Sequence, residues 1–252
     1  MPPRSEIAMI AGRTDRPMSR TAFRRAATLC VLTAVATAGV PAAGASGKTV
    51  DQLTETALAA APNPGRGNAQ FDRHCARCHG VGGQGDVDHR VPVLAGQRYA
   101  YLVRQLAGLS GDQREGVTMH RALAATEFHD PQTWADVSAY LEAAPVPVHP
   151  QTGDGRDLGL GEATFHVECA SCHYDDAGGD HDGLVPSLRN QNYAYLLSQI
   201  QRLAGLHRHN VDENIARLLR SLKPDEASAV ADYLSRLRGH PHGPRTTGND
   251  PD

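Results

Sequence analysis

The chain has 252 residues, and its 25 Lys and Arg residues are outnumbered by 28 Asp and Glu residues, which gives a formal net charge of −3 with histidine neutral. A basic patch is the electrostatic signature of nucleic-acid binding, so this acidic balance argues against a nucleic-acid partner. Aromatic residues make up only 5% of the chain, so large side chains alone would leave a hydrophobic core thin.

Residues 1–45 have the three parts of a secretory signal peptide. Basic residues precede an uncharged run at 26–40, and small residues follow that run. We expect cleavage after Ala45, with Ala43 as the second choice. The apolar run is about 15 residues long, which is short for a membrane anchor. The mature chain is therefore expected in a bacterial periplasm, without a transmembrane helix.

Removal of residues 1–45 changes the charge balance. It would take away six basic and two acidic residues and leave 19 basic and 26 acidic residues, a formal charge of −7. This charge is compatible with ordinary acidic solubilisation and equally with redox protein partners that have a basic docking face.

Two copies of Cys-x-x-Cys-His are the most informative feature of the chain. In each copy, two thiols lie close enough to bond to the two vinyl groups of one haem, and the adjacent histidine is placed to ligate the iron. The pattern predicts two covalently attached haem c groups. The predicted haem-binding residues are Cys75, Cys78, His79, Cys169, Cys172 and His173.

A zinc site is the main alternative for these motifs. Zinc sites built from two Cys-x-x-Cys pairs usually separate the pairs by about 15–20 residues, whereas these pairs are 94 residues apart and each is followed by histidine. A thioredoxin-like dithiol would require a βαβ pattern, and neither motif is flanked by strands. The fifth cysteine, Cys30, lies in the predicted signal peptide. Export agrees with haem c attachment, which takes place outside the cytoplasm.

The chain contains an internal repeat with a shift of 94 residues. Outside the motifs, the shift pairs Gly67 with Gly161, Phe71 with Phe165, Pro92 with Pro186, Leu94 with Leu188, Tyr99 with Tyr193, Tyr101 with Tyr195 and Gln105 with Gln199. Near the end, Tyr140 matches Tyr233 at a shift of 93. A period of this length indicates a duplicated domain and not a solenoid.

The repeat divides the mature chain into two domains, at 64–143 and 159–238. A linker rich in proline and glycine is expected at 144–158, and a polar tail at 239–252 is expected to be disordered. Each domain has fewer than about a hundred residues, so a covalently held haem would supply apolar bulk that the side chains lack.

The hydrophobic periodicity inside both domains is helical. Apolar residues recur at helical spacing over 134–141, after the Asp-Pro start signal at 130–131, and again over 230–237. The stretches 97–109 and 190–206 carry Tyr, Leu and Ile on one face. No alternating strand pattern is present, so both domains are predicted to be small and all-α.

The order of these features resembles a class I cytochrome c domain: a helix, Cys-x-x-Cys-His, a glycine-rich loop, Pro-x-Leu, a Tyr-x-Tyr-Leu helix and a final helix with Tyr-Leu. Two such domains in tandem, over about residues 64–238, resemble the dihaem cytochrome c four group. The resemblance implies that a proline carbonyl, of Pro92 or Pro186, accepts a hydrogen bond from the ligating histidine, His79 or His173.

The resemblance also implies a methionine as the sixth iron ligand. Met119 is the only methionine that remains after signal removal, and it lies 21 residues before Tyr140. A lone methionine could instead fill a core, but its position favours ligation in domain 1. A thioether ligand raises the reduction potential of a haem.

The second domain contains no methionine. Asp212 or Glu213 falls where Met119 would be, and neither suits a low-spin c-type haem. We expect His209 as the ligand, with His207 second, because neutral imidazole binds iron well. The alternative is that these histidines are solvated and the iron is five-coordinate.

The predicted function is that of a periplasmic dihaem c-type cytochrome that passes single electrons between redox partners. It would act as a soluble shuttle or as the cytochrome subunit of a larger dehydrogenase or oxidase system. The alternative is a dihaem enzyme whose open or labile domain-2 haem acts on peroxide, nitric oxide or a sulfur compound, although fold alone does not establish function. No catalytic side chain is predicted.

Overall fold

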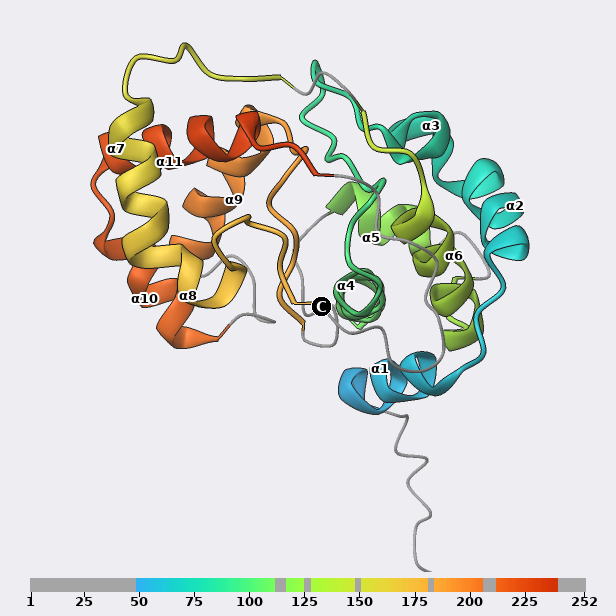
Figure 1. Cartoon of the computed structure of the whole chain (residues 1–252). Helices are drawn as coiled ribbons and strands as arrows, with labels where there is room; N and C mark the ends of the chain where they lie inside the picture. Colours follow the sequence, from blue (N-terminus) through green and yellow to red (C-terminus); the bar gives the residue numbers. More distant parts are fainter. Residues whose placement is uncertain are drawn as a thin grey trace, which may run out of the picture. The chain divides into compact units, whose positions relative to one another are not determined.

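A computed structural model describes residues 49–111, 117–124, 128–147, 151–180, 184–205 and 212–239. They belong to one compact unit within Ser46–Asp252. In these ranges the regular structure is helical, apart from an isolated antiparallel bridge between Asp86 and Val91 (Figure 1). The all-α fold class is therefore confirmed. None of the described helices is both long and apolar enough to cross a membrane.

Two groups of helices follow one another along the chain (Figure 1). Domain 1 denotes the group α1 (Val50–Ala59), α2 (Pro64–His74), α3 (Ala76–His79), the 3-10 turn η1 (Val81–Gly83), α4 (Tyr99–Ser110), α5 (Val117–Ala124) and α6 (Pro131–Ala143). Domain 2 denotes the group α7 (Leu158–Thr164), the π-helical segment η2 (Phe165–Cys169), α8 (Ala170–His173), α9 (Tyr193–Ala204), α10 (Glu213–Ser221) and α11 (Pro224–Arg236).

Side-chain caps explain where two helices of domain 1 begin. Asn63 accepts a backbone hydrogen bond at the start of α2, and Pro64 occupies the first helical position. Asp130 accepts a hydrogen bond from the backbone N–H of Gln132 at 3.1 Å, with Pro131 in the first position of α6. A cap satisfies a backbone N–H that the helix leaves open, and proline lacks that group. The helix start expected at 130–131 is confirmed.

Helix α1 is an element that the sequence pattern did not predict. Thr49 and Gln52 form a capping box at its start, with hydrogen bonds of 3.2 and 2.9 Å. Ala57 is fully buried, and the hydroxyl of Tyr99 on α4 donates a hydrogen bond to its carbonyl at 3.2 Å. The helical group of domain 1 therefore starts before residue 64.

An early helix and the last helix cross at a glycine in both domains, α2 with α6 and α7 with α11. A Cβ atom at Gly67 on α2 would overlap the carbonyl oxygen of Asp136 on α6, and one at Gly161 on α7 would overlap that of Ala229 on α11. These glycines are equivalent in the repeat. Because only glycine lets two backbones approach so closely, the same requirement at the crossing explains both residues.

An aromatic pair packs beside each crossing. The ring centroids of Phe71 and Tyr140 are 5.7 Å apart, and those of Phe165 and Tyr233 are 5.8 Å apart, within the range of favourable aromatic contacts. Around these pairs the buried core of domain 1 includes Tyr99, Val103, Trp134, Val137 and Leu141, and that of domain 2 includes Leu196, Val230, Ala231 and Leu234. The repeat in the sequence is therefore a repeat in packing.

Candidate haem-binding sites

The chain turns at the first cysteine of the domain-1 motif. Cys75 ends α2 and precedes α3, and the backbone N–H of His79 donates to the Cys75 carbonyl at 2.9 Å, which closes the motif into one helical turn. Cys75 is half-buried and Cys78 is exposed, whereas His79 is only 5% exposed. The turn therefore places the imidazole inside the domain, the Cys75 thiol at the edge of the core and the Cys78 thiol at the surface.

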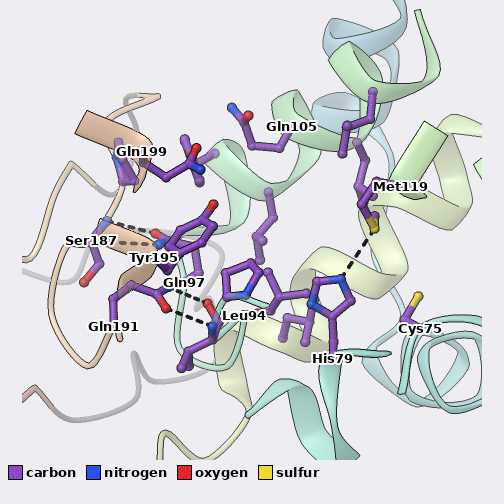
Figure 2. A pocket seen from close by; sticks show the side chains of 18 of the residues that line it. Cys75, His79, Leu94, Gln97, Gln105, Met119, Ser187, Gln191, Tyr195 and Gln199 are labelled. Carbon is purple, nitrogen blue, oxygen red and sulfur yellow. Dashed lines mark hydrogen bonds between the residues drawn. The ribbon is translucent and has the colours of Figure 1, made fainter. Parts of the chain in front are cut away.

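The side chain of His79 faces that of Met119 on α5. Their Nε2 and Sδ atoms are 3.5 Å apart, and Figure 2 shows both side chains pointing into the same cavity, with Cys75 nearby. The structure thus brings together an imidazole nitrogen and a thioether sulfur from segments 40 residues apart. These are the two atoms that would ligate a haem iron from opposite sides.

A cavity of about 500 Å³ contains this pair, a volume in the usual range for a bound cofactor. Its apolar lining in domain 1 includes Phe71, Leu94, Leu102, Leu109, Leu123, Val137 and Leu141, and its lining in domain 2 includes Pro186, Leu188, Leu196 and Leu203. The thiols, the facing ligand atoms and the apolar walls fit a covalently attached macrocycle in domain 1.

The motif of domain 2 holds its histidine by a hydrogen bond. His173 Nδ1 donates to the carbonyl of Pro186 at 3.0 Å, as the resemblance implied. This bond leaves Nε2 with its lone pair for a metal. Burial lowers the pKa of His173, although the Pro186 bond acts in the opposite direction, so the neutral form that binds iron is favoured. Domain 1 differs from what the resemblance implied. His79 Nδ1 makes no hydrogen bond to the Pro92 carbonyl, and Nε2 of the same ring contacts Met119 Sδ.

The environment of the first cysteine in each motif does not favour the thiolate form. Burial raises the pKa of the Cys75 thiol to about 12 and that of the Cys169 thiol to about 11, with nearby charges adding to both shifts. Zinc ligation and nucleophilic attack require the thiolate. Within the part of the chain that the structure describes, no three His, Cys, Asp or Glu side chains are grouped to hold a metal ion. Burial of Cys75 and Cys169 therefore argues against a zinc-thiolate site at these two residues.

The sixth-ligand predictions for domain 2 have different outcomes. His209 and His207 lie outside the described residues. Asp212 caps α10, accepting a hydrogen bond from the backbone N–H of Asn214 at 2.7 Å, and Glu213 is 3.6 Å from Arg217. Both acidic side chains therefore have roles at the start of this helix.

A short sequence match pairs the methionine of α5 with an apolar residue of α10. Helices α5 and α10 share an Arg-x-Leu pattern, Arg121 to Leu123 and Arg217 to Leu219, and aligning this pattern pairs Met119 with Ile215. Counting residues from the flanking motifs missed this match because the loops before and after the two helices differ in length. An isoleucine offers no lone pair, so α10 provides no thioether at this position.

Two glutamines form reciprocal bonds between the domains (Figure 2). Gln97 donates from Nε2 to the Ser187 carbonyl at 2.9 Å and accepts from the Ser187 N–H at 2.8 Å. Gln191 binds the backbone of Val93 in the same way, at 2.9 and 3.0 Å. The shift of 94 residues that pairs Gln97 with Gln191 also pairs Val93 with Ser187, so the two contacts are related by pseudo-twofold symmetry. The sequence analysis did not single out these residues, although the repeat contained the signal.

Comparison with known proteins agrees with this description. The cytochrome c family model matches residues 65–144 and 159–238. Cytochrome c4 from Stutzerimonas stutzeri is 29% identical over 180 residues, which cover 65% of this chain and 84% of that protein. The thiosulfate dehydrogenase electron acceptor from Thiomonas intermedia (strain K12) is 29% identical over 133 residues, 50% of this chain and 61% of that protein.

The fold is also found in a solved structure. Reduced recombinant cytochrome c4 from Pseudomonas stutzeri superposes with a TM-score of 0.62 at 23% sequence identity, over 71% of this chain and 100% of the other. The relatives favour electron transfer over the enzymatic alternative. With the family matched across both repeats and a histidine and two thiols at each site, the chain belongs to the cytochrome c family, as a dihaem class I electron-transfer cytochrome with one covalently bound haem c in each domain.

Proposed function

We propose that this chain is exported to the periplasm and passes single electrons between redox proteins through two haems with different axial ligands. The observation that carries the proposal is the 3.5 Å approach of His79 Nε2 to Met119 Sδ in an apolar cavity beside Cys75. The bound haem supplies the one-electron chemistry, while the protein supplies ligands, spacing and dielectric.

Each motif has a defined part in this proposal. The proposed attachment points are Cys75, Cys78, Cys169 and Cys172, and the proposed iron ligands are His79, Met119, His173 and His209. Ile215 at the methionine position supports a different sixth ligand in domain 2. His209 is proposed ahead of His207, and both belong to the segment between α9 and α10, which corresponds to the segment that leads to Met119.

The ligand difference predicts unequal reduction potentials. A thioether stabilises reduced iron relative to a second imidazole, so the domain-1 haem should have the higher potential and an electron should rest there. Magnetic circular dichroism should show a sulfur-to-iron charge-transfer band from one haem and a bis-imidazole signature from the other. A redox titration with resolved haem signals tests the order, and equal potentials or a higher domain-2 potential would contradict it.

Substitutions assign each signal to its domain. Met119→His should remove the sulfur band and lower the domain-1 potential, and His209→Ala should produce a high-spin domain-2 haem that binds carbon monoxide. His207→Ala is the matched control and should leave both haems low-spin. If His207→Ala gives the high-spin signal and His209→Ala does not, the second-choice ligand is correct.

The proposed partners are redox proteins with a basic docking face, because removal of residues 1–45 would leave a formal charge of −7. The Thiomonas relative is named as the electron acceptor of a thiosulfate dehydrogenase, which makes a dehydrogenase a candidate electron donor. Reduction by that donor should slow as ionic strength rises. Stable co-purification would identify the chain as a subunit, and transient binding would identify it as a shuttle.

Export is proposed with cleavage after Ala45. It is supported by the basic residues, the uncharged run at 26–40 and the small residues that follow this run. Mass analysis of protein purified from the periplasm should show a chain that starts at Ser46 and carries two haem adducts. A chain retained in the cytoplasm, or one with fewer adducts, would contradict the proposal.

A further inference from the structure

The bonds of Gln97 reach the proximal side of the other domain's haem site. The Ser187 N–H, which donates to Gln97 Oε1 at 2.8 Å, belongs to the same peptide unit as the Pro186 carbonyl. That carbonyl accepts the 3.0 Å hydrogen bond from His173 Nδ1. An unbroken chain of hydrogen bonds therefore runs from a side chain of domain 1, through one peptide group, to the proposed iron ligand of domain 2.

Hydrogen bonds in such a chain strengthen one another. Donation from an amide N–H polarises its peptide group and makes the carbonyl oxygen a better acceptor. A stronger acceptor at Nδ1 raises the basicity of a ligating imidazole, which stabilises oxidised iron. We propose that Gln97 is a positioning residue that lowers the reduction potential of the domain-2 haem from the other domain. The inference rests on the proposed role of His173 as an iron ligand.

The neighbouring residue fixes the same region. Arg98 donates from Nε to the Gly178 carbonyl at 2.8 Å and from Nη2 to the Gly179 carbonyl at 3.1 Å. The Gly179 N–H in turn donates to the His173 carbonyl at 3.1 Å. Domain 1 therefore binds both loops that surround His173, and the peptide group between Gln97 and His173 has little freedom to rotate.

The reciprocal contact is not equivalent in its consequence. Gln191 binds the Val93 peptide with the same geometry, and that peptide includes the Pro92 carbonyl. His79 does not bond to Pro92, however, and faces Met119. The counterpart of Arg98 in the repeat is Asn192, whose side chain accepts a hydrogen bond from the Gln151 N–H of the linker at 2.9 Å. The two glutamines thus form equal contacts between the domains, but only that of Gln97 continues to a histidine.

This asymmetry provides a matched control. Gln97→Met and Gln191→Met each remove one pair of interdomain hydrogen bonds at almost constant side-chain volume. In the two-haem protein, Gln97→Met should raise the domain-2 potential and shift the hyperfine-shifted ring resonances of His173. Gln191→Met should leave both readouts close to wild type. Gln97→Glu keeps an acceptor for the Ser187 N–H and should give a domain-2 potential at or below that of wild type.

The contrary outcomes are distinct. An unchanged domain-2 potential in Gln97→Met, or an equal rise in Gln191→Met, would overturn the inference, because the second result would reflect loosened domains and not the hydrogen-bond chain. A potential in Gln97→Glu as high as in Gln97→Met would also overturn it. Absence of hyperfine-shifted His173 signals from wild-type protein would overturn the ligand assignment itself, and the inference with it.

Discussion

Directly after the haem motif, the backbone takes the same path in both domains, although the residues at the turn differ. Gly80, directly after His79, has φ 73° and ψ 163°, and its counterpart Tyr174 has φ 61° and ψ 164°. This region of backbone conformation is normally restricted to glycine. Domain 2 therefore keeps the turn although its side chain makes the turn unfavourable, which shows that the path of the chain here is dictated by the site and not by local preference.

Two further positions repeat this difference. Gly83 and Gly96 have φ values of 78° and 71°, and their counterparts Ala177 and Asn190 both have φ 55°. Asparagine tolerates the left-handed region better than alanine does. The shared requirement is the loop around the ligating histidine, whose carbonyl accepts a hydrogen bond from the glycine N–H six residues later in both domains, at 2.8 and 3.1 Å.

The largest expected effect concerns how strongly each domain depends on its haem. The described core of domain 1 includes α1 and the buried Trp134, whereas that of domain 2 is smaller. Loss of attachment through Cys169→Ser with Cys172→Ser should therefore unfold more of the chain than the matched Cys75→Ser with Cys78→Ser. Far-UV circular dichroism of the two single-haem proteins measures this, and equal losses would mean that both domains need the haem alike.

The second prediction concerns the glycine at the helix crossing, which both domains share. Gly67→Ala and Gly161→Ala should each destabilise the protein by about 1–3 kcal/mol, because a Cβ atom would overlap a backbone carbonyl at the helix crossing. Gly159 on α7 faces open space, so Gly159→Ala should be neutral or stabilising by up to about 1 kcal/mol. Thermal unfolding of the three variants gives the comparison, and a mild effect at only one crossing would show that the two are not equally tight.

These shared features explain how much could be predicted from the sequence. The haem motifs, the duplication and the all-helical class follow from short-range chemistry and from repeated residues such as Phe71 and Phe165. The spacing of Met119 from the final helix also indicated that it would face His79, and the structure places its Sδ atom 3.5 Å from His79 Nε2; its role as iron ligand stays a prediction. The haem motifs could be predicted because each lies within five consecutive residues, and the duplication because its residues occur twice in the chain.

The features that could not be predicted depend on distant contacts. Helix α1 is stabilised by packing on α4, including the bond from Tyr99 to Ala57, and its capping box alone is a weak local signal. The bond from Gln97 to Ser187 spans 90 residues, so it follows from how the two domains meet. The positive φ of Tyr174 could not be predicted from its residue type, because tyrosine rarely adopts it; only the equivalence with Gly80 explains it.

A third effect compares two buried carboxylates. Burial alone would raise the pKa of Asp136, but hydrogen bonds from Arg66, from the Asn63 N–H and from Gln132 lower it below its usual 3.8. Burial would likewise raise the pKa of Asp232, and hydrogen bonds from Arg236 and from two glycine N–H groups lower it. Asp136 thus fixes the start of α2, whereas Asp232 fixes the segment before α7 through Gly153 and Gly155, each at 2.8 Å.

A carboxylate whose pKa is lowered by folding stabilises the protein above its usual pKa. That stability is lost as the pH falls below about 3.8 and the folded form takes up the proton. Asp136→Asn and Asp232→Asn should each cost about 1–3 kcal/mol at neutral pH, since the substitution removes the negative charge and turns one of the two acceptor oxygens into an N–H donor that faces other donors. Both variants should also show a shallower loss of stability below pH 4. Denaturant titrations at several pH values measure this, and an unchanged acid slope would assign the acid sensitivity to other groups.

The smallest expected change in stability concerns the turn that follows each Cys-x-x-Cys-His motif. Tyr174→Gly should stabilise the protein by about 1 kcal/mol, because relief of about 1–3 kcal/mol of backbone strain outweighs the greater chain entropy of glycine. Tyr174 is 54% exposed, so little packing is lost. Gly80→Ala is the reverse experiment and should destabilise domain 1 by a similar amount. If Tyr174→Gly instead lowers the denaturation midpoint, the ring contributes more to domain 2 than the turn costs, and the two turns are equivalent in path but not in energy.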